Sequence, residues 1–193
     1  IVLDGMQGGT GATQDVFIEH VGIPTLPALR QAVEALVELD MHRKVQLVVS
    51  GGIRSGADVA KALAMGADAV SIGTAALIAL GDNSPEFEED YEKLGSKAGF
   101  FDDYQAGLCP AGISTQDEEV AKRLDPVAGG QRLANYLNTL TMEAQIIARA
   151  CGKSHLLNLE PEDLCATTVE AAAMAGVPLA GTHWIPGQLD TPR

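Results

Sequence analysis

Aromatic residues and long apolar runs are both scarce in this sequence. Phe, Trp and Tyr make up 4% of its 193 residues, whereas glycine alone occurs 21 times. A chain rich in small residues favours helices packed closely on a sheet, as in α/β proteins. No apolar stretch approaches the roughly 18 residues that a transmembrane helix needs. The sequence therefore predicts a globular α/β protein without a membrane span.

Basic residues are also few. The chain has 13 Lys and Arg against 26 Asp and Glu, which gives a formal net charge of −13. Nucleic acids and anionic membranes would repel such a chain, so we expect neither as a partner.

The three cysteines are widely spaced and odd in number, so the sequence predicts no disulfide framework. A reducing, cytoplasmic location is the expectation that follows. No pair among the four histidines has metal-ligand spacing, and we expect no metal site. The opening residues Ile1–Asp4 have no basic region before them and are typical of a buried strand rather than a signal peptide. Because a chain end normally lies outside a core, we expect an incomplete domain.

Residues 1–80 repeat a strand, loop and helix rhythm. Strands are predicted at Ile1–Asp4, Val45–Val49 and Ala69–Ile72, and helices at Pro27–Leu39 and Ala57–Met65. Connections this short between strands imply parallel pairing with a right-handed crossover. Either a (β/α)8 barrel or a doubly wound sheet is compatible with this pattern.

The character of the sequence changes after residue 80. Residues 82–103 carry eight acidic residues against two lysines and show no strong period. We interpret this run as a solvated surface or, alternatively, as a docking face for a basic partner. Asp125 followed by proline predicts the start of a long helix that ends near Gly152. Thr167 with Glu170 fits a capping box for a last short helix.

Glycines follow two of the predicted strands at the same relative point. A phosphate group is bound by backbone N–H groups, which side chains would obstruct, so glycine is favoured at such turns. In barrels, the loops after the last two strands commonly form a phosphate site. The alternatives are that the glycines only make tight turns and that Arg54 is a solvent-exposed helix-entry charge. The predicted phosphate-binding residues are Ser50, Gly51, Gly52, Arg54, Gly73 and Thr74.

Several motifs resemble the FMN domain of the glutamate synthase family. The family's Asp-Gly-Gly-Thr-Gly-Ala loop has a counterpart in residues 4–12, with Met6 and Gln7 inserted. A His-Ala-Gly-Leu-Pro-like turn has its counterpart in His20-Val21-Gly22-Ile23-Pro24. The family's Cys-Pro-Val-Gly-Ile-Ala-Thr-Gln segment is matched by residues 109–116. The resemblance covers nearly the whole chain.

This resemblance implies a fold class and a division into domains. Residues 1–80 would be the C-terminal portion, strands 6 to 8, of an FMN-binding (β/α)8 TIM barrel. Residues 81–193 would be a mostly helical C-terminal extension packed on the barrel. A barrel usually needs about 250 residues, so strands 1 to 5 are expected from an N-terminal portion outside this chain.

The resemblance also suggests roles for individual residues. The loop after the first strand is expected to face the flavin and the substrate, with Gln7, Gly8, Gly9 and Thr10. His20 is a weak candidate for a proton donor, although a structural role is favoured. The other catalytic residues are expected in the missing part of the barrel.

One departure from the family bears on the reaction. Family members hold an iron–sulfur cluster with three closely spaced cysteines, but only Cys109 remains here. The alternative is that Cys151 and Cys165, which lie in other segments, are recruited to a cluster. One thiolate does not bind a cluster. We therefore expect FMN as the cofactor and no iron–sulfur cluster. A reaction without net electron transfer needs no outside electrons, which favours the N-methylglutamate synthase branch.

In that branch, glutamate and methylamine would give N-methylglutamate and ammonia, with a hydride held transiently on FMN. The enzyme would be a glutamate-synthase-like oxidoreductase acting as a methylamine–glutamate N-methyltransferase. One alternative is a glutamate synthase that uses 2-oxoglutarate and ammonia. Others are a non-catalytic scaffold that channels ammonia and a generic phosphate-binding α/β enzyme. The expected partners are an amino acid or amine substrate, the N-terminal barrel portion, and glutaminase-like and other glutamate-synthase-like subunits of a hetero-oligomer.

Overall fold

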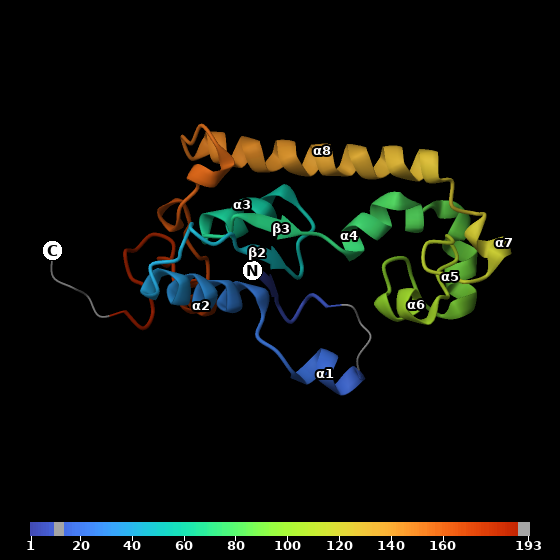
Figure 1. Cartoon of the computed structure of the whole chain (residues 1–193), viewed down its shortest axis with the longest axis horizontal. Coiled ribbons are helices and arrows are strands. Elements are labelled where there is room, and N and C mark those ends of the chain that lie inside the picture. Colours follow the sequence, from blue (N-terminus) through green and yellow to red (C-terminus); the bar gives the residue numbers. More distant parts are fainter. Residues whose placement is uncertain (10–13, 189–193) are drawn as a thin grey trace. The chain divides into compact units, whose positions relative to one another are not determined.

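The computed structural model of the chain describes residues 1–9 and 14–188. These residues form two compact units (Figure 1). The sheet unit contains residues 1–9, 21–71 and 142–188, and the helical unit contains residues 14–20 and 72–141. The division of the chain at residue 80 and the packing of the extension on a barrel stay predictions.

Three short parallel strands form the sheet. They are β1 (Val2–Asp4), β2 (Val48–Ser50) and β3 (Ala69–Ser71), paired in the order β1-β2-β3. The register places Asp4 opposite Ser50 and Ser50 opposite Ser71, so the three carboxyl ends lie in one row. The predicted parallel α/β arrangement is confirmed, whereas membership of a closed barrel stays a prediction.

Two helices connect these strands and supply the core. Both α2 (Thr25–Glu38) and α3 (Gly56–Ala64) were expected from their apolar periodicity. Val49 in the central strand is fully buried, as expected for a strand covered on both faces. The main cluster joins both helices to the sheet through Leu29, Leu36, Leu47, Val49, Ala62, Met65 and Ala67.

The last part of the sheet unit is a series of short helices. These are η3 (Leu156–Asn158), η4 (Pro161–Asp163) and α9 (Val169–Ala175). The predicted cap of the last helix is wrong by one residue, because Thr168 and not Thr167 accepts the N–H of Ala171. Thr168 has the extended backbone that an N-cap needs, and the helix ends at Gly176, whose backbone is left-handed.

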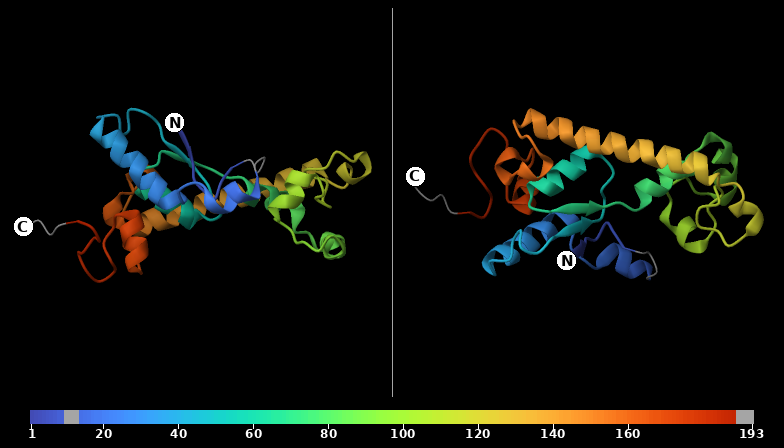
Figure 2. Two further views of the ribbon diagram at one scale, coloured as in Figure 1. Left: turned by 90° about the horizontal axis from the view of Figure 1, so that it is seen from below. Right: turned by 45° about the horizontal axis from the view of Figure 1, so that its top comes forward.

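The helical unit is built mainly from short elements. They are α1 (Asp15–His20), α4 (Thr74–Leu77), η1 (Ile78–Asp82), η2 (Pro85–Phe87), α5 (Glu88–Leu94), α6 (Phe101–Ala106) and α7 (Glu118–Ala121). The long helix α8 (Pro126–Ala150) begins in this unit and ends in the sheet unit. Asp125 caps it through the N–H groups of Val127 and Ala128, as its sequence predicts. Figure 2 shows α8 as one uninterrupted helix.

The acidic run between residues 82 and 103 is not uniformly a solvated surface. It contains η2, α5 and the start of α6, and two of its carboxylates, Asp82 and Asp103, are buried. Short helices of fewer than two turns cannot show a clear period, which explains why the sequence did not reveal them. One buried cluster of this unit contains Phe87, Tyr91, Cys109 and Ala111.

Among the described residues, no helix combines the length and the apolar character that crossing a bilayer requires.

Candidate functional site

The loops that follow β1 and β2 are tied together by Thr25, the first residue of α2. The Thr25 N–H donates to Oε1 of Gln7 at 2.8 Å. The Thr25 hydroxyl lies 2.8 Å from the same Oε1 and 3.0 Å from the carbonyl oxygen of Gly51, so it can donate to either. Gln7 therefore fixes the loop after β1 against both the helix and the loop after β2. The sequence did not reveal this contact, because Gln7 stands in an apparent insertion.

Close packing accounts for several glycines of these two loops. A Cβ atom on Gly5 would collide with the Thr25 side chain, and one on Gly8 would collide with the Asp4 carboxylate. At Gly51, a Cβ would lie 2.6 Å from Oγ1 of Thr25, and the backbone φ of +112° also favours glycine. Tight turns and close packing therefore suffice to explain glycine at these three positions, without a bound phosphate.

Gly73 differs from these glycines. No atom lies within 4 Å of the place where a Cβ would stand, but its φ of −110° and ψ of −97° lie outside the regions that residues with side chains favour. Packing therefore does not require glycine here, whereas the backbone conformation favours it. The open space beside Gly73 is compatible with an anion bound by bare backbone N–H groups.

The predicted phosphate residues follow adjacent strands. Ser50, Gly51 and Gly52 end β2 and begin the loop after it, in the sheet unit. Gly73 and Thr74 come shortly after Ser71, which is the register partner of Ser50, and they belong to the helical unit. Gly52 has a φ of +77°, and a Cβ there would make only ordinary contact with the Gln7 side chain. The structure thus describes all of the predicted turn residues.

The loop residues expected to face the substrate are only partly described. Gln7, Gly8 and Gly9 are exposed after β1, and Gly8 lies directly against Gly51. Thr10 lies outside the described residues. His20 is exposed in the last turn of α1, and its predicted role stays a prediction.

The N-terminus of α3 is filled by carboxylates of the chain itself. Ser55 and Asp58 form a capping box, and Oδ2 of Asp58 also accepts the N–H of Arg54 at 3.1 Å. Oε2 of Glu143, on α8, accepts the N–H of Gly56 at 2.6 Å. A phosphate bound at this edge would therefore use the glycine turns rather than the first turn of α3. Sequence reasoning missed Glu143, which lies 87 positions from Gly56.

Arg54 is exposed at the entry to α3. Its side chain thus lies close in sequence to both the Gly51–Gly52 turn and the capping box. Exposure is compatible with a role in phosphate pairing and with the alternative, a helix-entry charge.

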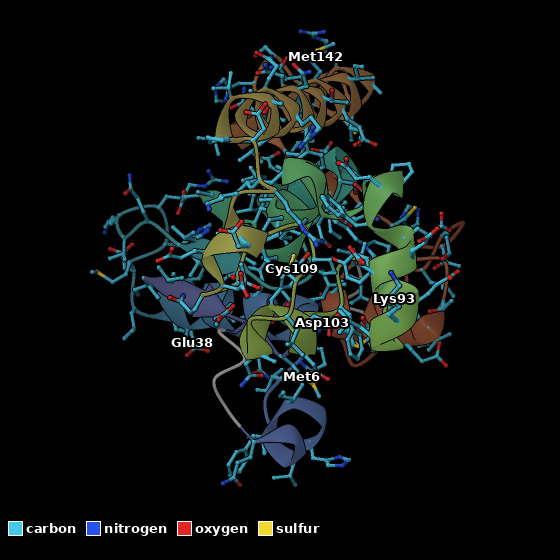
Figure 3. All side chains as sticks on the ribbon, turned by 90° about the vertical axis from the view of Figure 1, so that its right-hand side faces the viewer. Met6, Glu38, Lys93, Asp103, Cys109 and Met142 are labelled. Atoms are coloured by element: carbon cyan, nitrogen blue, oxygen red, sulfur yellow. The ribbon has the colours of Figure 1, made fainter. Side chains whose placement is uncertain are left out.

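Cys109 lies in the helical unit, where Figure 3 labels it together with Asp103. It is fully buried, and its thiol donates to Oδ1 of Asp82 at 3.1 Å. Burial, together with the hydrogen bond to Asp82, raises the pKa of the Cys109 thiol, which disfavours the thiolate that binds metals.

The surroundings of Cys109 can be compared with what an iron–sulfur cluster needs. Cys151 and Cys165 are exposed and belong to the sheet unit. In the described part of the chain, no three His, Cys, Asp or Glu side chains are grouped to hold a metal ion. These residues do not fit a cluster, which requires three or four cysteine thiolates.

Comparison with known proteins identifies relatives of the chain. A family model described as a conserved region in glutamate synthase matches residues 1–85 and 104–154. A glutamate synthase large subunit-like protein from Rhizobium meliloti (strain 1021) is 74% identical over 188 residues, which is 97% of this chain and 42% of the relative. An archaeal glutamate synthase (NADPH) from Methanocaldococcus jannaschii is 40% identical over 159 residues, or 82% of this chain and 28% of the relative.

A third relative is an archaeal-type glutamate synthase (NADPH) from Thermotoga maritima. It is 41% identical over 152 residues, which is 79% of this chain and 27% of that protein. The chain spans less than half the length of these relatives. The match over well over half of the chain, together with the high identity to the Rhizobium protein, shows that the chain belongs to the glutamate synthase family.

Proposed function

We propose that this chain is part of an FMN-dependent enzyme of the glutamate synthase family that exchanges ammonia for methylamine on glutamate. One observation carries the choice of reaction. The only cysteine of residues 109–116, Cys109, is a buried thiol that donates to Asp82, and its neighbours do not fit a cluster. A reaction without net electron transfer is therefore favoured over one that needs an iron–sulfur cluster to pass electrons from an external donor.

The glycine turns support FMN as the cofactor. Gly51 and Gly52 follow β2, and Gly73 follows the adjacent strand β3 without any packing requirement for glycine. Their N–H groups would bind the phosphate of FMN, because the first turn of α3 is already occupied by Asp58 and Glu143. When bound, FMN would supply reversible storage of a hydride.

The proposed exchange balances without an added reductant. Glutamate and methylamine are consumed, and N-methylglutamate and ammonia are formed. The α-carbon of glutamate loses a hydride, methylamine then displaces ammonia at that carbon, and the same carbon regains the hydride. The contribution of this chain is to bind the cofactor phosphate and to hold the loop after β1 in place through Gln7 and Thr25.

Two other functions of the whole protein are open to the same test. The relatives named archaeal glutamate synthase (NADPH) favour a synthase that makes glutamate from 2-oxoglutarate and ammonia. A scaffold that channels ammonia would have no use for FMN, so bound flavin distinguishes it from either enzyme. Glutaminase-like and other glutamate-synthase-like subunits are proposed partners in either enzyme.

The reaction is tested on the full-length protein assembled with its partner subunits. We expect N-methylglutamate from glutamate and methylamine, detected by mass spectrometry, without any reductant. In parallel, 2-oxoglutarate and glutamine are supplied with NADPH. Glutamate formation in the second assay together with no product in the first would contradict the proposal and favour the synthase.

FMN binding is tested with a matched pair of variants, Gly73→Asp and Gly130→Asp. Both glycines have open space at the Cβ position and neither has a positive φ, but Gly130 belongs to α8 and not to a predicted phosphate turn. We expect Gly73→Asp to raise the dissociation constant of FMN at least about tenfold, because its carboxylate would stand beside a phosphate dianion. Gly130→Asp should bind FMN like the unchanged protein. Equal FMN binding by both variants would contradict the phosphate site.

A further inference from the structure

The helical unit has a fully buried carboxylate at its centre. Asp82, the last residue of η1, is 0% exposed. Its Oδ1 accepts hydrogen bonds from the Tyr91 hydroxyl and, at 3.1 Å, from the Cys109 thiol. Its Oδ2 accepts the Gly99 N–H at 2.6 Å and the Tyr104 hydroxyl at 2.7 Å. We call this set of five residues the Asp82 network.

Neutral donors, and no cation, stabilise this carboxylate. None of the ion pairs found in the described part of the chain includes Asp82. An ionised carboxylate buried without compensation costs several kcal/mol, so these four donors are essential to its burial. Hydrogen bonds to a charged acceptor are about twice as strong as those between neutral groups.

The donors stay protonated over the ordinary pH range. Burial first, and then hydrogen bonding to Asp82, raises the pKa of both Tyr91 and Tyr104. The same two causes raise the pKa of the Cys109 thiol. Asp82 is thus surrounded by groups that keep the hydrogen atoms it accepts.

The network joins segments that are otherwise short and separate. Tyr91 lies on α5, Tyr104 on α6, and Gly99 and Cys109 lie in the segments before and after α6. Tyr91 and Cys109 also pack with Phe87 and Ala111 in the buried core of the unit. Elements of three to seven residues are unstable alone, so a shared acceptor at their centre orders all of them.

We propose that the Asp82 network organises residues 78–109 in the place where related enzymes would hold an iron–sulfur cluster, so that this unit folds without iron. The inference deepens the proposed function, on which it rests, by explaining how the segment around the single remaining cysteine is held together. Asp82 acts as a positioning residue for the unit and takes no part in the chemistry.

The first experiment compares Asp82→Asn with Asp102→Asn in the full-length protein. Asp102 is exposed on α6, so its variant removes the same charge without touching the network. An Asn amide would direct its NH2 group at two of the four donors. We expect limited proteolysis within residues 78–109 to become about tenfold faster or more for Asp82→Asn. Asp102→Asn should stay within about twofold of the unchanged protein, and equal protection in both variants would overturn the proposal.

A second pair of variants, at Cys109, tests the network even if Asp82→Asn does not fold. Serine at position 109 keeps a donor for Asp82, whereas alanine removes it. We expect Cys109→Ser to be cleaved like the unchanged protein and Cys109→Ala to be cleaved faster. A cluster ligand would be lost in both variants, so equal disruption by serine and alanine would contradict the network.

Iron is then tested directly. The full-length protein is incubated anaerobically with ferrous iron and sulfide and desalted, and its iron is measured. We expect iron far below one atom per chain and unchanged proteolysis. Stoichiometric iron that Cys109→Ser abolishes would overturn the proposal.

FMN content and amine exchange are measured on the same preparations. Loss of protection in Asp82→Asn without any amine exchange in the unchanged protein would contradict the proposed function and leave the network standing. Amine exchange in the unchanged protein together with full protection in Asp82→Asn would contradict the network and leave the proposed function standing.

Discussion

Single residues near the strand ends have separable roles. Gly51 is needed by its backbone conformation and by its contact with Thr25, whereas Gly73 is favoured by its backbone conformation alone and has open space beside it. In the sequence the two positions look alike, because each is a glycine that follows a predicted strand. The distinction between a packing glycine and one that leaves room for a ligand therefore depends on what surrounds the missing Cβ atom.

Gln7 is predicted to stabilise the loop after β1. Its Oε1 accepts from both the N–H and the hydroxyl of Thr25, and Thr25 is buried. Gln7→Ala leaves these donors without that acceptor, so we expect the free energy of unfolding to fall by about 1 kcal/mol. Denaturant unfolding of the full-length protein measures it, with the exposed Gln46→Ala as the control. An equal effect of both substitutions would show that the Thr25 contact is not stabilising.

The three cysteines are predicted to react at very different rates. Cys151 and Cys165 are exposed, whereas Cys109 is buried and its thiol pKa is raised, mainly by burial and then by Asp82. A raised pKa lowers the thiolate fraction at pH 8, and the thiolate is the reactive form. Iodoacetamide labelling of the native protein, read by peptide mass spectrometry, should modify Cys151 and Cys165 well before Cys109. Labelling after denaturation should equalise the three, and rapid native labelling of Cys109 would contradict its placement.

At the scale of elements, predictability follows the length of the element and the range of its contacts. The helices α2, α3 and α8 are long enough for an apolar period, and Ser55 and Asp125 mark the starts of α3 and α8. The short helices between residues 82 and 106 contain too few turns for such a pattern. Their arrangement depends on Asp82, whose donors lie up to 27 positions away and include two tyrosines that no local pattern singles out.

The candidate site also combines local features that the sequence predicts with long-range contacts that it does not. The turns after β2 and β3 were predictable, because a buried strand followed by glycine is a local signal. The contacts of Gln7 with Thr25 and of Glu143 with Gly56 join positions far apart in the sequence. Only the folded chain brings such pairs together, so sequence reasoning had no signal for them.

Glu143 is predicted to join two helices. Its carboxylate accepts the first N–H of α3 at 2.6 Å, where the positive end of the helix dipole favours a negative charge. Buried alanines of α3 pack with Ala148 near the end of α8, so the bond reinforces an existing contact. We expect Glu143→Ala to lower the free energy of unfolding by about 1 kcal/mol.

The control for this prediction is Gln145→Ala, at an exposed position on the same helix. Denaturant unfolding compares the two variants, and Glu143→Gln measures how much of the effect depends on charge. If Glu143→Ala is no less stable than Gln145→Ala, the bond between α8 and α3 does not stabilise the unit.

At the scale of the whole molecule, the sheet has two open edges. It contains three strands of three residues, and β1 and β3 have no further strand partner in the part of the chain that the structure describes. Ile1 and Val2 are 65% and 68% exposed, although their composition is typical of a buried strand. Open edges of this kind favour pairing with another strand. Further strands of the proposed barrel would satisfy both edges.

A positive charge introduced on the outer strand tests this idea. Residues 1–193 expressed alone should self-associate through β1, and Val2→Lys should reduce that association, because lysine on an edge strand opposes pairing. In the full-length protein the same substitution should lower the melting temperature, since it would place a charge in a paired strand. Val127→Lys, on the exposed start of α8, should do neither. Light scattering and thermal unfolding measure the two effects, and a monomeric, stable chain of residues 1–193 would mean that the β1 edge needs no partner.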